Sequence, residues 1–592
     1  MLLYSLLHLF GYGDLSKEDL MNFRQLGSKT AGHPEYGHTV GVEATTGPLG
    51  AGMGMAVGMA AAEAHLAAIF NKENYPVVDH YTYVLGGDGC MMEGISSEAF
   101  SLAGTLGLSK LIVLYDSNRI SIEGSTDIAF RENVQERMQA FGFQTITVEY
   151  GNDIDAIGKA IEAAKADTEH PSFITIKTQI GFGCPAKQGK ASAHGEPLGV
   201  ENVEALRKNL NWPSEEPFFV PEEVYKNYSE IAEQKAEVEA AWNVMFAAYC
   251  EEYPEMEALW NQYHNAKAGE ALKDDAGFWA KQEKPEASRA ISGRLINYIK
   301  DVLPNLFGGS ADLAPSNKTN MKDAGDFSKE DRAGRNLHFG VRELAMAAIG
   351  NGIMLHGGLR AYVSTFFVFS DYCKPMARLS ALMGVPLTYV FTHDSIGVGE
   401  DGPTHEPIEQ MAALRAMPNF HVFRPCDATE TEAAWYSAVT SEHTPTALVL
   451  TRQNLEPMAG SSREALKGGY IIDDCEGTPE LILIASGSEV ALAVHAKETL
   501  AAEGQKVRVV SMPCMDLFEE QSEEYKESVL PREVRRRVAV EALGSFGWDK
   551  YTGLDGKIIA MESFGASAPA GLLFKKFGFT VEHVVEVAKS LK

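Results

Sequence analysis

Two short segments, far apart in the chain, carry side chains that suit chemistry better than packing. In the first, Gly87-Asp88-Gly89 is followed by Asn118, 30 positions after Asp88. Carboxylate and amide oxygens, joined by a backbone carbonyl near Ile120, are ligands that Mg²⁺ or Ca²⁺ accepts. The two glycines let the backbone approach a diphosphate at the start of the next helix. Gly-Asp-Gly alone is an ordinary turn, but the asparagine at this offset favours a metal–diphosphate site.

The second segment offers groups for proton transfer. Gly-Val-Arg-Glu at 340–343 opens an Ala- and Met-rich stretch, and a loop with two histidines follows at 393–405. The alternatives are a surface-helix position for Glu343 and structural roles for the histidines. A hydrolase relay within 393–395 is excluded, because adjacent residues of one loop do not readily form that geometry. Taken together, the two segments indicate an enzyme that uses thiamine diphosphate.

Composition narrows the class of protein. The 592 residues predict two to four domains, and the net charge of −29 argues against a nucleic-acid partner. Seven scattered cysteines without a Cys-x-x-Cys pair predict a reducing, cytoplasmic location. The apolar opening, residues 1–10, lacks the features of a signal peptide and is too short to span a bilayer. We therefore expect a buried helix there and no membrane partner.

The elements that must position these residues alternate between strands and helices. Helices are expected at 50–70 and 93–108. Short β-rich runs predict strands at 81–85, 111–115, 173–178, 306–308, 361–363, 387–391, 481–485 and 507–511. This alternation predicts an α/β fold of three consecutive α/β domains with mostly parallel sheets. Asp88 and Asn118 each follow a strand, at the sheet edge where ligands gather.

A polar, helical segment separates the first two domains. It runs over residues 215–287, and we expect it to pack along the surface with Trp242, Trp260 and Trp279 as anchors.

Motifs in order along essentially the whole chain resemble those of transketolase, a thiamine diphosphate-dependent family. The matching strings are Gly32-His33-Pro34, Gly47-Pro48-Leu49-Gly50, Gly86-Gly87-Asp88-Gly89-Cys90-Met91-Met92-Glu93-Gly94, Ser192-Ala193-His194-Gly195, Gly308-Gly309-Ser310-Ala311-Asp312-Leu313, Gly340-Val341-Arg342-Glu343, the loop His393–His405 and Thr451-Arg452-Gln453-Asn454. Strings this long and uncommon are highly specific.

The resemblance implies a thiamine diphosphate-binding fold and a transferase activity. Transketolase, a glycolaldehyde transferase of the pentose phosphate pathway, reversibly moves a two-carbon ketol unit from a ketose phosphate to an aldose phosphate through a thiamine diphosphate carbanion. The implied assembly is a homodimer with active sites at the subunit interface. The implied domains are a diphosphate-binding domain at 1–214, the linker at 215–287, a pyrimidine-binding domain at 288–455 and a C-terminal α/β domain at 468–592.

The resemblance also assigns roles, residue by residue. The implied metal ligands for Mg²⁺ (or Ca²⁺) are Asp88, Asn118 and Ile120. The implied thiamine diphosphate contacts are Gly47, Pro48, Leu49, Gly89, Asn118, His194, Asp312, Phe366, Phe369 and Tyr372. The implied sugar phosphate contacts are His33, Arg289, Ser316, His393, Asp401, His405 and Arg452. The implied catalytic groups are Glu343, His405, His194 and His33, and Glu93 resembles a carboxylate at the dimer interface.

Each role has a chemical reason. A glutamate that protonates the cofactor pyrimidine is expected to be buried with a raised pKa, and this is the expectation for Glu343. Imidazoles titrate near working pH and suit proton transfer to sugar hydroxyls. Two guanidinium groups with a serine and an imidazole form a phosphate clamp. Taken singly, Arg289 or Arg452 is equally consistent with an ordinary surface ion pair.

By the same comparison the chain begins late. We expect it to lack an N-terminal segment in which the family carries two further histidine motifs. Three explanations stay open: activity without that segment, a pseudoenzyme or regulatory dimer with reduced or no activity, or a segment supplied separately. A formaldehyde-accepting ketotransferase or a phosphoketolase would reuse much of the same machinery. The intact set of Asp88, Asn118 and Glu343 favours an active transketolase.

Overall fold

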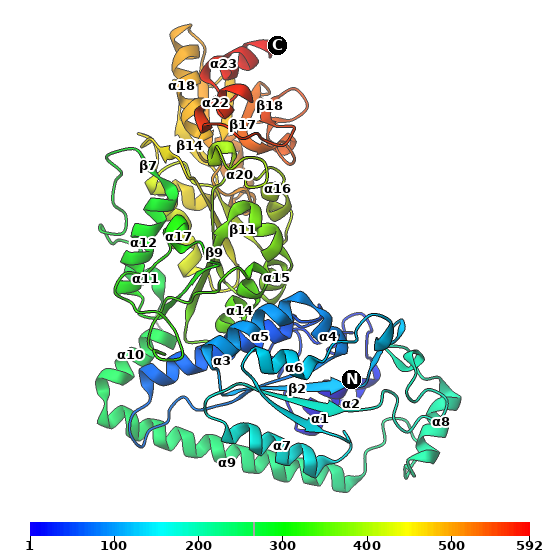
Figure 1. The fold of residues 1–592 in the computed structure, drawn as a ribbon. Coiled ribbons are helices and arrows are strands. Elements are labelled where there is room, and N and C mark those ends of the chain that lie inside the picture. Colours follow the sequence, from blue (N-terminus) through cyan, green and yellow to red (C-terminus); the bar gives the residue numbers. More distant parts are fainter. Residues whose placement is uncertain (265–266, 592) are drawn as a thin grey trace. The chain divides into compact units, whose positions relative to one another are not determined.

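The computed structural model describes residues 1–264 and 267–591, which divide into two compact units (Figure 1). The first unit comprises 1–261 with 327–333 and 351–357, and the second comprises 262–326, 334–350 and 358–592. Residues 265 and 266, within the expected linker, and Lys592, at the end of the expected third domain, lie outside the described residues.

The first unit is built on a four-stranded, fully parallel sheet in the order β1-β2-β6-β5. Its strands are β1 (Thr82–Gly87), β2 (Leu111–Ser117), β5 (Gln144–Val148) and β6 (Ser172–Lys177). Its main covering helices are α3 (Ala51–Phe70), α5 (Gly94–Leu106), α6 (Val134–Ala140) and α7 (Ile154–Ala166). Figure 1 shows α3, α5 and α6 on one face of the sheet and α7 on the other. Strands 81–85, 111–115 and 173–178 were therefore placed from the sequence to within two residues.

Helix α3 forms much of the core of this unit. Its Ala-, Gly- and Met-rich surface packs closely, so that Val57 and Ala61 are 0% exposed. By length and composition alone α3 is long enough and apolar enough to cross a membrane, but 72% of that stretch is buried inside the protein. A helix in the core of a globular protein can be equally long and apolar, and the burial of α3 agrees with such a core position.

The opening of the chain folds as the expected helix, α1 (Leu2–Leu9), but it is only half-buried. Tyr4 and Leu7 point inward, whereas Leu2 is 68% exposed, because a single helix face meets the small cluster around Leu15 and Leu20. The expectation of a buried helix was therefore right about the helix and wrong about its burial.

The segment expected as a linker is helical and is divided between the two units. It contains α9 (Glu222–Glu252), α10 (Pro254–His264) and α11 (Ala268–Leu272). In the first unit, the Trp242 indole donates a hydrogen bond to the Val77 carbonyl at 3.1 Å. In the second unit, Trp279 packs against Tyr436 with ring centroids 5.6 Å apart.

The second unit contains two five-stranded sheets and a short two-stranded one, and the first five-stranded sheet is fully parallel in the order β11-β12-β10-β9-β8. Its strands are β8 (Leu306–Ser310), β9 (Arg360–Phe366), β10 (Thr388–Thr392), β11 (His421–Phe423) and β12 (Thr446–Leu450). Figure 1 shows α12 (Ser288–Val302) and α17 (Ala428–Thr440) on one face and α15 (Ser370–Met383) on the other. Every residue of the central strand β10 is buried, as a strand covered on both faces must be.

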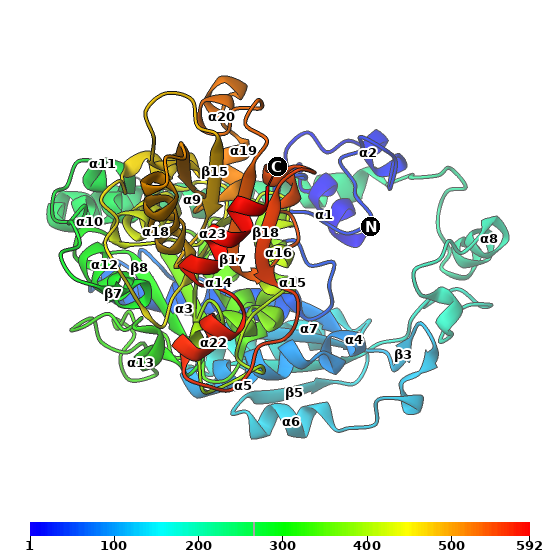
Figure 2. The same cartoon turned by 90° about the horizontal axis from the view of Figure 1, so that it is seen from above.

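The last sheet has the order β14-β16-β15-β17-β18, with only β14 antiparallel. Its strands are β14 (Tyr470–Asp473), β15 (Leu481–Ala485), β16 (Val507–Ser511), β17 (Arg537–Gly544) and β18 (Lys557–Met561). Helices α18 (Glu489–Ala502) and α23 (Val581–Ser590) pack together on one face, as Figure 2 also shows. On β15, Leu481 and Leu483 enter the core under these helices, and Ile482 and Ile484 enter a separate core on the other face. Alternate side chains of one strand thus serve two cores.

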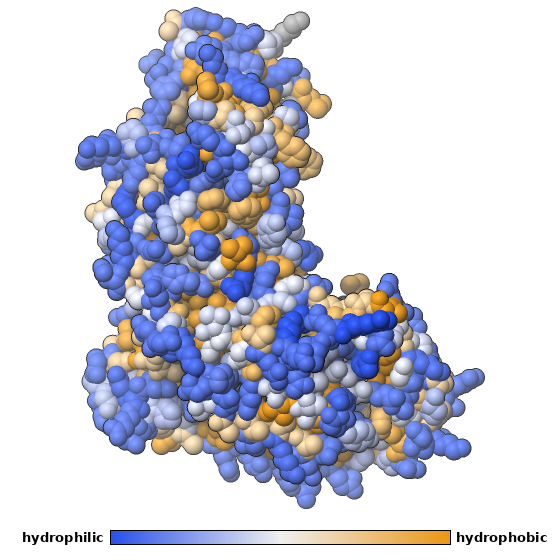
Figure 3. Space-filling model, viewed as in Figure 1, coloured by the Kyte–Doolittle hydropathy of each residue, from blue (hydrophilic) through white to orange (hydrophobic). Residues whose placement is uncertain are grey.

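The face of the protein drawn in Figure 3 is mostly polar. Figure 3 shows a mostly hydrophilic face with scattered apolar residues, in keeping with 22% charged residues.

Leu483→Ala tests the importance of the inner strand β15. Leu483 is 0% exposed, and its truncation leaves a cavity, so the free energy of unfolding is expected to fall by about 2–5 kcal/mol. Leu554→Ala is the control, because Leu554 is fully exposed (102%), and the change there should stay within about 0.5 kcal/mol. Urea unfolding monitored by circular dichroism measures both; equal losses in the two variants would contradict this account of the core.

Candidate active site

In the first unit, the predicted metal ligands lie at the carboxyl edge of the parallel sheet. Strands β1 and β2 are paired in parallel, with Gly87 opposite Asp116. Asp88 follows β1 directly and Asn118 follows β2, so both side chains emerge at the same edge. The Arg119 amide donates a hydrogen bond to Asp88 Oδ2 at 2.9 Å, which joins the two strand ends.

Burial and hydrogen bonding define the state of Asp88. Its side chain is 5% exposed, and burial raises the pKa of the carboxyl above its ordinary value. The Tyr115 hydroxyl donates to Oδ1, and the Ile120 amide donates to Asn118 Oδ1 at 2.9 Å. Each of these oxygens keeps a further lone pair for a cation, and a cation would favour the ionised carboxylate.

The donor set fits a hard divalent cation. Among the described residues no group of three or more His, Cys, Asp or Glu side chains could hold a metal. A metal at Asp88 would therefore need the Asn118 amide, a backbone carbonyl and oxygens of a bound anion, and this is the combination that the sequence predicts.

The glycine-rich loops of this unit approach their neighbours closely. A Cβ added at Gly89 would lie 2.9 Å from Leu49 Cδ1, and one added at Gly47 would lie 3.7 Å from His33 Cβ. The structure thus brings Gly89 to Leu49 and Gly47 to His33. His194 lies exposed after the short 3₁₀ turn at Ala191–Ala193, and the hydrogen bonds of Asp88 and Asn118 do not involve it.

In the second unit, aromatic rings and imidazoles gather at the carboxyl ends of β9 and β10. The Phe366 ring centroid lies 3.8 Å from that of His393 and 6.1 Å from that of Phe369, with the two phenyl rings nearly parallel. Phe369 lies 5.5 Å from His405 and 6.1 Å from Tyr372. Five residues that the sequence assigns to cofactor or substrate thus form one cluster.

Four residues beside this group form what we call the anion cluster: Arg289, Ser316, His393 and Arg452. Arg289 Nη1 donates to the Ser316 carbonyl at 3.0 Å and lies 3.3 Å from His393 Nε2. Arg452 Nη1 donates to the Val398 carbonyl at 3.1 Å. The two guanidinium groups repel each other, and burial with this repulsion lowers the pKa of Arg289. An anion bound here would relieve that repulsion.

His393 is neutral in this cluster. Burial, followed by the positive charges of Arg289 and Arg452 and by His405, lowers the pKa of His393 to about 3. The imidazole therefore offers an uncharged donor or acceptor and adds no positive charge at neutral pH.

Three acidic residues of the predicted site lie nearer the surface of the unit. Glu343 begins α14 (Glu343–His356), and its carbonyl accepts a hydrogen bond from Cys373 Sγ at 3.5 Å, next to Tyr372 in α15. Its side chain is partly exposed in the single chain, so the expectation of a buried glutamate is wrong for the chain by itself, because the first turn of a helix borders the surface. Asp312, with φ 61°, and Asp401 are exposed.

Glu406 was missed by the sequence analysis. It is 2% exposed, and a Cβ added at Gly565 would lie 1.8 Å from its Oε2. Burial raises the pKa of Glu406 to about 7, against an opposing hydrogen bond from the Ala566 backbone. Its place directly after His405 was the only signal in the sequence.

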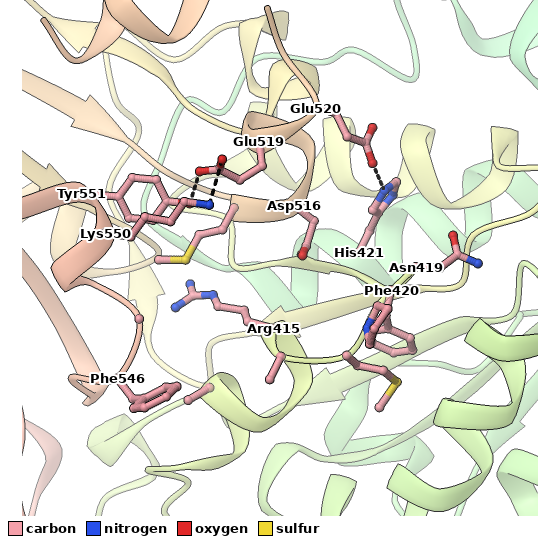
Figure 4. A pocket seen from close by; sticks show the side chains of 16 residues that line it. Arg415, Asn419, Phe420, His421, Asp516, Glu519, Glu520, Phe546, Lys550 and Tyr551 are labelled. Carbon is pink, nitrogen blue, oxygen red and sulfur yellow. Dashed lines mark hydrogen bonds and ion pairs between the residues drawn. The ribbon is translucent and has the colours of Figure 1, made fainter. Parts of the chain in front are cut away.

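A separate cavity of about 410 Å³ in the second unit contains none of the predicted site residues. Figure 4 shows Arg415 and Asp516 beside it, with ion pairs from Lys550 to Glu519 at 2.8 Å and from His421 to Glu520 at 3.3 Å. The candidate site is therefore defined by the two clusters above.

Glu406→Gln tests the buried carboxyl through pH. The pKa of Glu406 is higher in the folded protein than in the unfolded chain, so the folded protein binds this proton more strongly. The free energy of unfolding therefore falls as pH rises from about 4.5 to about 7. The variant should be more stable than the parent at pH 8 by on the order of 1–2 kcal/mol and similar at pH 4.5. Thermal unfolding at both pH values measures this, with exposed Glu409→Gln as control; equal destabilisation of Glu406→Gln at both would contradict it.

Three family models match successive parts of this chain. The model described as "Transketolase, thiamine diphosphate binding domain" matches residues 1–268. The model described as "Transketolase, pyrimidine binding domain" matches 284–458, and "Transketolase-like TK C-terminal domain" matches 468–580. The expectation of three α/β domains with mostly parallel sheets and a thiamine diphosphate-binding fold is confirmed. These matches do not bear out the expectation of a missing N-terminal segment.

Known proteins are similar over the whole chain. The transketolases of Halalkalibacterium halodurans and Bacillus subtilis are each 54% identical, with 100% of this chain and 89% of theirs aligned. The solved transketolase of Leishmania mexicana has 46% identity and a TM-score of 0.95, covering 100% of this chain and 88% of that one. A Pichia stipitis transketolase solved with sedoheptulose 7-phosphate has 45% identity and a TM-score of 0.95, covering 100% and 87%. The chain therefore belongs to the transketolase family of thiamine diphosphate-dependent transferases.

Proposed function

We propose that this protein reversibly transfers a two-carbon ketol unit from a ketose phosphate to an aldose phosphate, with thiamine diphosphate and Mg²⁺ (or Ca²⁺). The main support for a phosphorylated sugar as substrate is the anion cluster. In it, the positive charges of Arg289 and Arg452 both lower the pKa of the buried His393 imidazole, which packs against the Phe366 ring. Similar solved transketolases contain sedoheptulose 7-phosphate and fructose 6-phosphate. The intact site and the high identity support an active enzyme over a pseudoenzyme.

The first unit would hold the metal and the diphosphate. Asp88, Asn118 and the Ile120 carbonyl would bind the metal, and Gly89 and His194 would contact the diphosphate, with the loop Gly47-Pro48-Leu49 beside the cofactor. The support is the buried carboxylate joined to the next strand end by the Arg119 amide, and the close approach of Gly89 to Leu49.

The second unit would hold the pyrimidine ring and the sugar. Phe366, Phe369 and Tyr372 offer aromatic surface for the ring, and Glu343 and Asp312 would face it. When bound, the cofactor supplies an acyl-anion equivalent that accepts and donates the ketol unit. Glu343 would hold a proton at the pyrimidine nitrogen, for which its place near Tyr372 is the support.

The remaining polar residues would serve the sugar. His405, His194 and His33 would take up and return protons at sugar hydroxyls, because imidazoles titrate near neutral pH. Asp401 would hydrogen-bond the sugar from the loop that also carries His405. The anion cluster would bind the phosphate with charge-assisted hydrogen bonds.

The distribution of these groups supports a proposed homodimer. Each unit contains one half of the predicted site, and we propose that a second copy of the chain supplies the complementary half at a subunit interface. Burial of Glu343 would then come from the partner, since the single chain leaves it partly exposed. We also propose, as for the dimer, the domain boundaries expected from the sequence and a cytoplasmic location.

Glu343→Ala tests the proposed reaction. With Mg²⁺ and thiamine diphosphate, the parent should transfer the ketol unit from xylulose 5-phosphate to ribose 5-phosphate. The variant should lose at least about 100-fold in kcat, because it removes the proposed proton on the pyrimidine. Product formation by chromatography measures both, with exposed Glu442→Ala as control. No cofactor-dependent product from the parent would overturn the proposal, and acetyl phosphate as product would indicate a phosphoketolase.

Asp88→Asn tests the metal ligand separately from turnover. The amide keeps the shape of the side chain but removes the negative charge that a cation needs. Thiamine diphosphate binding in the presence of Mg²⁺, measured by calorimetry, should weaken about 10–100-fold. The control is Asp127→Asn, an exposed carboxylate near the same strand ends. Unchanged affinity with Asp88→Asn would contradict the assignment.

A further inference from the structure

Arg424 is a completely buried arginine that none of the roles above uses. It follows β11 in the second unit, and its side chain is 0% exposed. Its Nε donates to Asp394 Oδ2 at 3.0 Å, and its Nη2 forms an ion pair with the same oxygen at 2.8 Å. From its other side, Nη1 donates to the Ser486 carbonyl at 2.8 Å and to Glu489. The Arg424 guanidinium thus links the loop after β10, through Asp394, to the first residue of α18, Glu489, on the last sheet.

The loop end of this contact is the residue after His393. Asp394 is 0% exposed, and its other oxygen, Oδ1, accepts a hydrogen bond from the Ser395 hydroxyl at 3.1 Å. A buried carboxylate without a charged partner would be strongly unfavourable. Arg424 is therefore the group that allows Asp394 to remain inside the protein at this point of the loop.

His393 has a backbone that needs such support. Its φ is 64°, a left-handed conformation that is uncommon for a non-glycine residue and needs support from its surroundings. With that backbone, Nδ1 lies 2.8 Å from the Thr392 hydroxyl and Nε2 lies 3.3 Å from Arg289 Nη1. This backbone and these two contacts together hold the imidazole next to Arg289.

We propose that Arg424 is a positioning residue for phosphate recognition: by holding Asp394, it fixes His393 in the anion cluster. The inference rests on the proposed function, in which that cluster binds the sugar phosphate. Arg424 itself touches no substrate. Its effect should appear with ligands that carry a phosphate and be absent with those that do not.

The competing explanation is a purely structural brace between two sheets. Loss of a brace would lower stability and reduce activity with every sugar to the same degree. Loss of a positioning residue would separate phosphorylated from unphosphorylated donors, and this difference decides between them.

The test is Arg424→Lys in the full-length protein. Lysine keeps the charge but cannot contact Asp394 and Glu489 in two directions at once, as the planar guanidinium does. We expect kcat/KM for xylulose 5-phosphate to fall about tenfold through KM, and kcat/KM for xylulose to stay within about twofold. Asp394→Asn, which changes the loop side of the same contact, should show the same selective loss and serves if the lysine variant folds poorly.

Arg508→Lys is the matched control. Arg508 is 8% exposed and binds Asp474 through two nitrogens at 2.9 and 3.0 Å in the last sheet, away from the anion cluster. In this variant, kcat/KM for xylulose 5-phosphate and kcat/KM for xylulose should both stay within about twofold of the parent values.

Inorganic phosphate binding gives a readout that does not depend on turnover. By calorimetry, Arg424→Lys should weaken phosphate binding about tenfold relative to the parent, and Arg508→Lys should not. Equal losses with both sugars, or unchanged phosphate affinity in folded Arg424→Lys and Asp394→Asn, would overturn the inference. A parent that binds phosphate but forms no ketol-transfer product would overturn the proposed function instead.

Discussion

Parallel pairing of strands is the constraint on which both halves of the candidate site depend. A parallel sheet places all its carboxyl ends along one edge, and its connecting helices cover both faces. Asp88 and Asn118 meet because β1 and β2 run side by side, and Phe366 meets His393 because β9 and β10 do. The chemistry then needs only short loops at strand ends, since the sheets fix where those loops begin.

The second unit has a further requirement, which is to keep charges inside the protein. Arg415 binds Glu541 through two nitrogens at 2.8 Å, and the Ser486 hydroxyl donates to the same glutamate. Arg424 also contacts Ser486 and lies between two carboxylates. Such buried groups are tolerable only when each has a partner. The loop at 393–405 is thus attached to a network that reaches the last sheet.

The same environment sets the chemistry of the histidines. His393 is neutral because it is buried and because the positive charges of Arg289 and Arg452 lower its pKa, whereas His405 lies at the edge of the aromatic cluster, beside Phe369. In the proposed function, two imidazoles of one loop would therefore serve different purposes: His393 would complete an anion-binding surface, and His405 would take part in proton transfer. No property of the histidine side chain alone distinguishes them.

The sequence by itself determined the parallel α/β class, the family motifs and eight of the strands, whereas strands such as β5 (Gln144–Val148) and β17 (Arg537–Gly544) were not predicted. Short β-rich runs that end in glycine or polar residues depend on neighbouring residues only, and so β15 (Leu481–Ala485) could be placed to the residue. Tertiary structure alone decided that Arg424 is buried, that Glu406 points at Gly565 and that α1 leaves one face exposed. These outcomes depend on which distant residues surround a side chain. Arg424 meets Asp394 and Glu489 across separations of 30 and 65 positions, which no local pattern records.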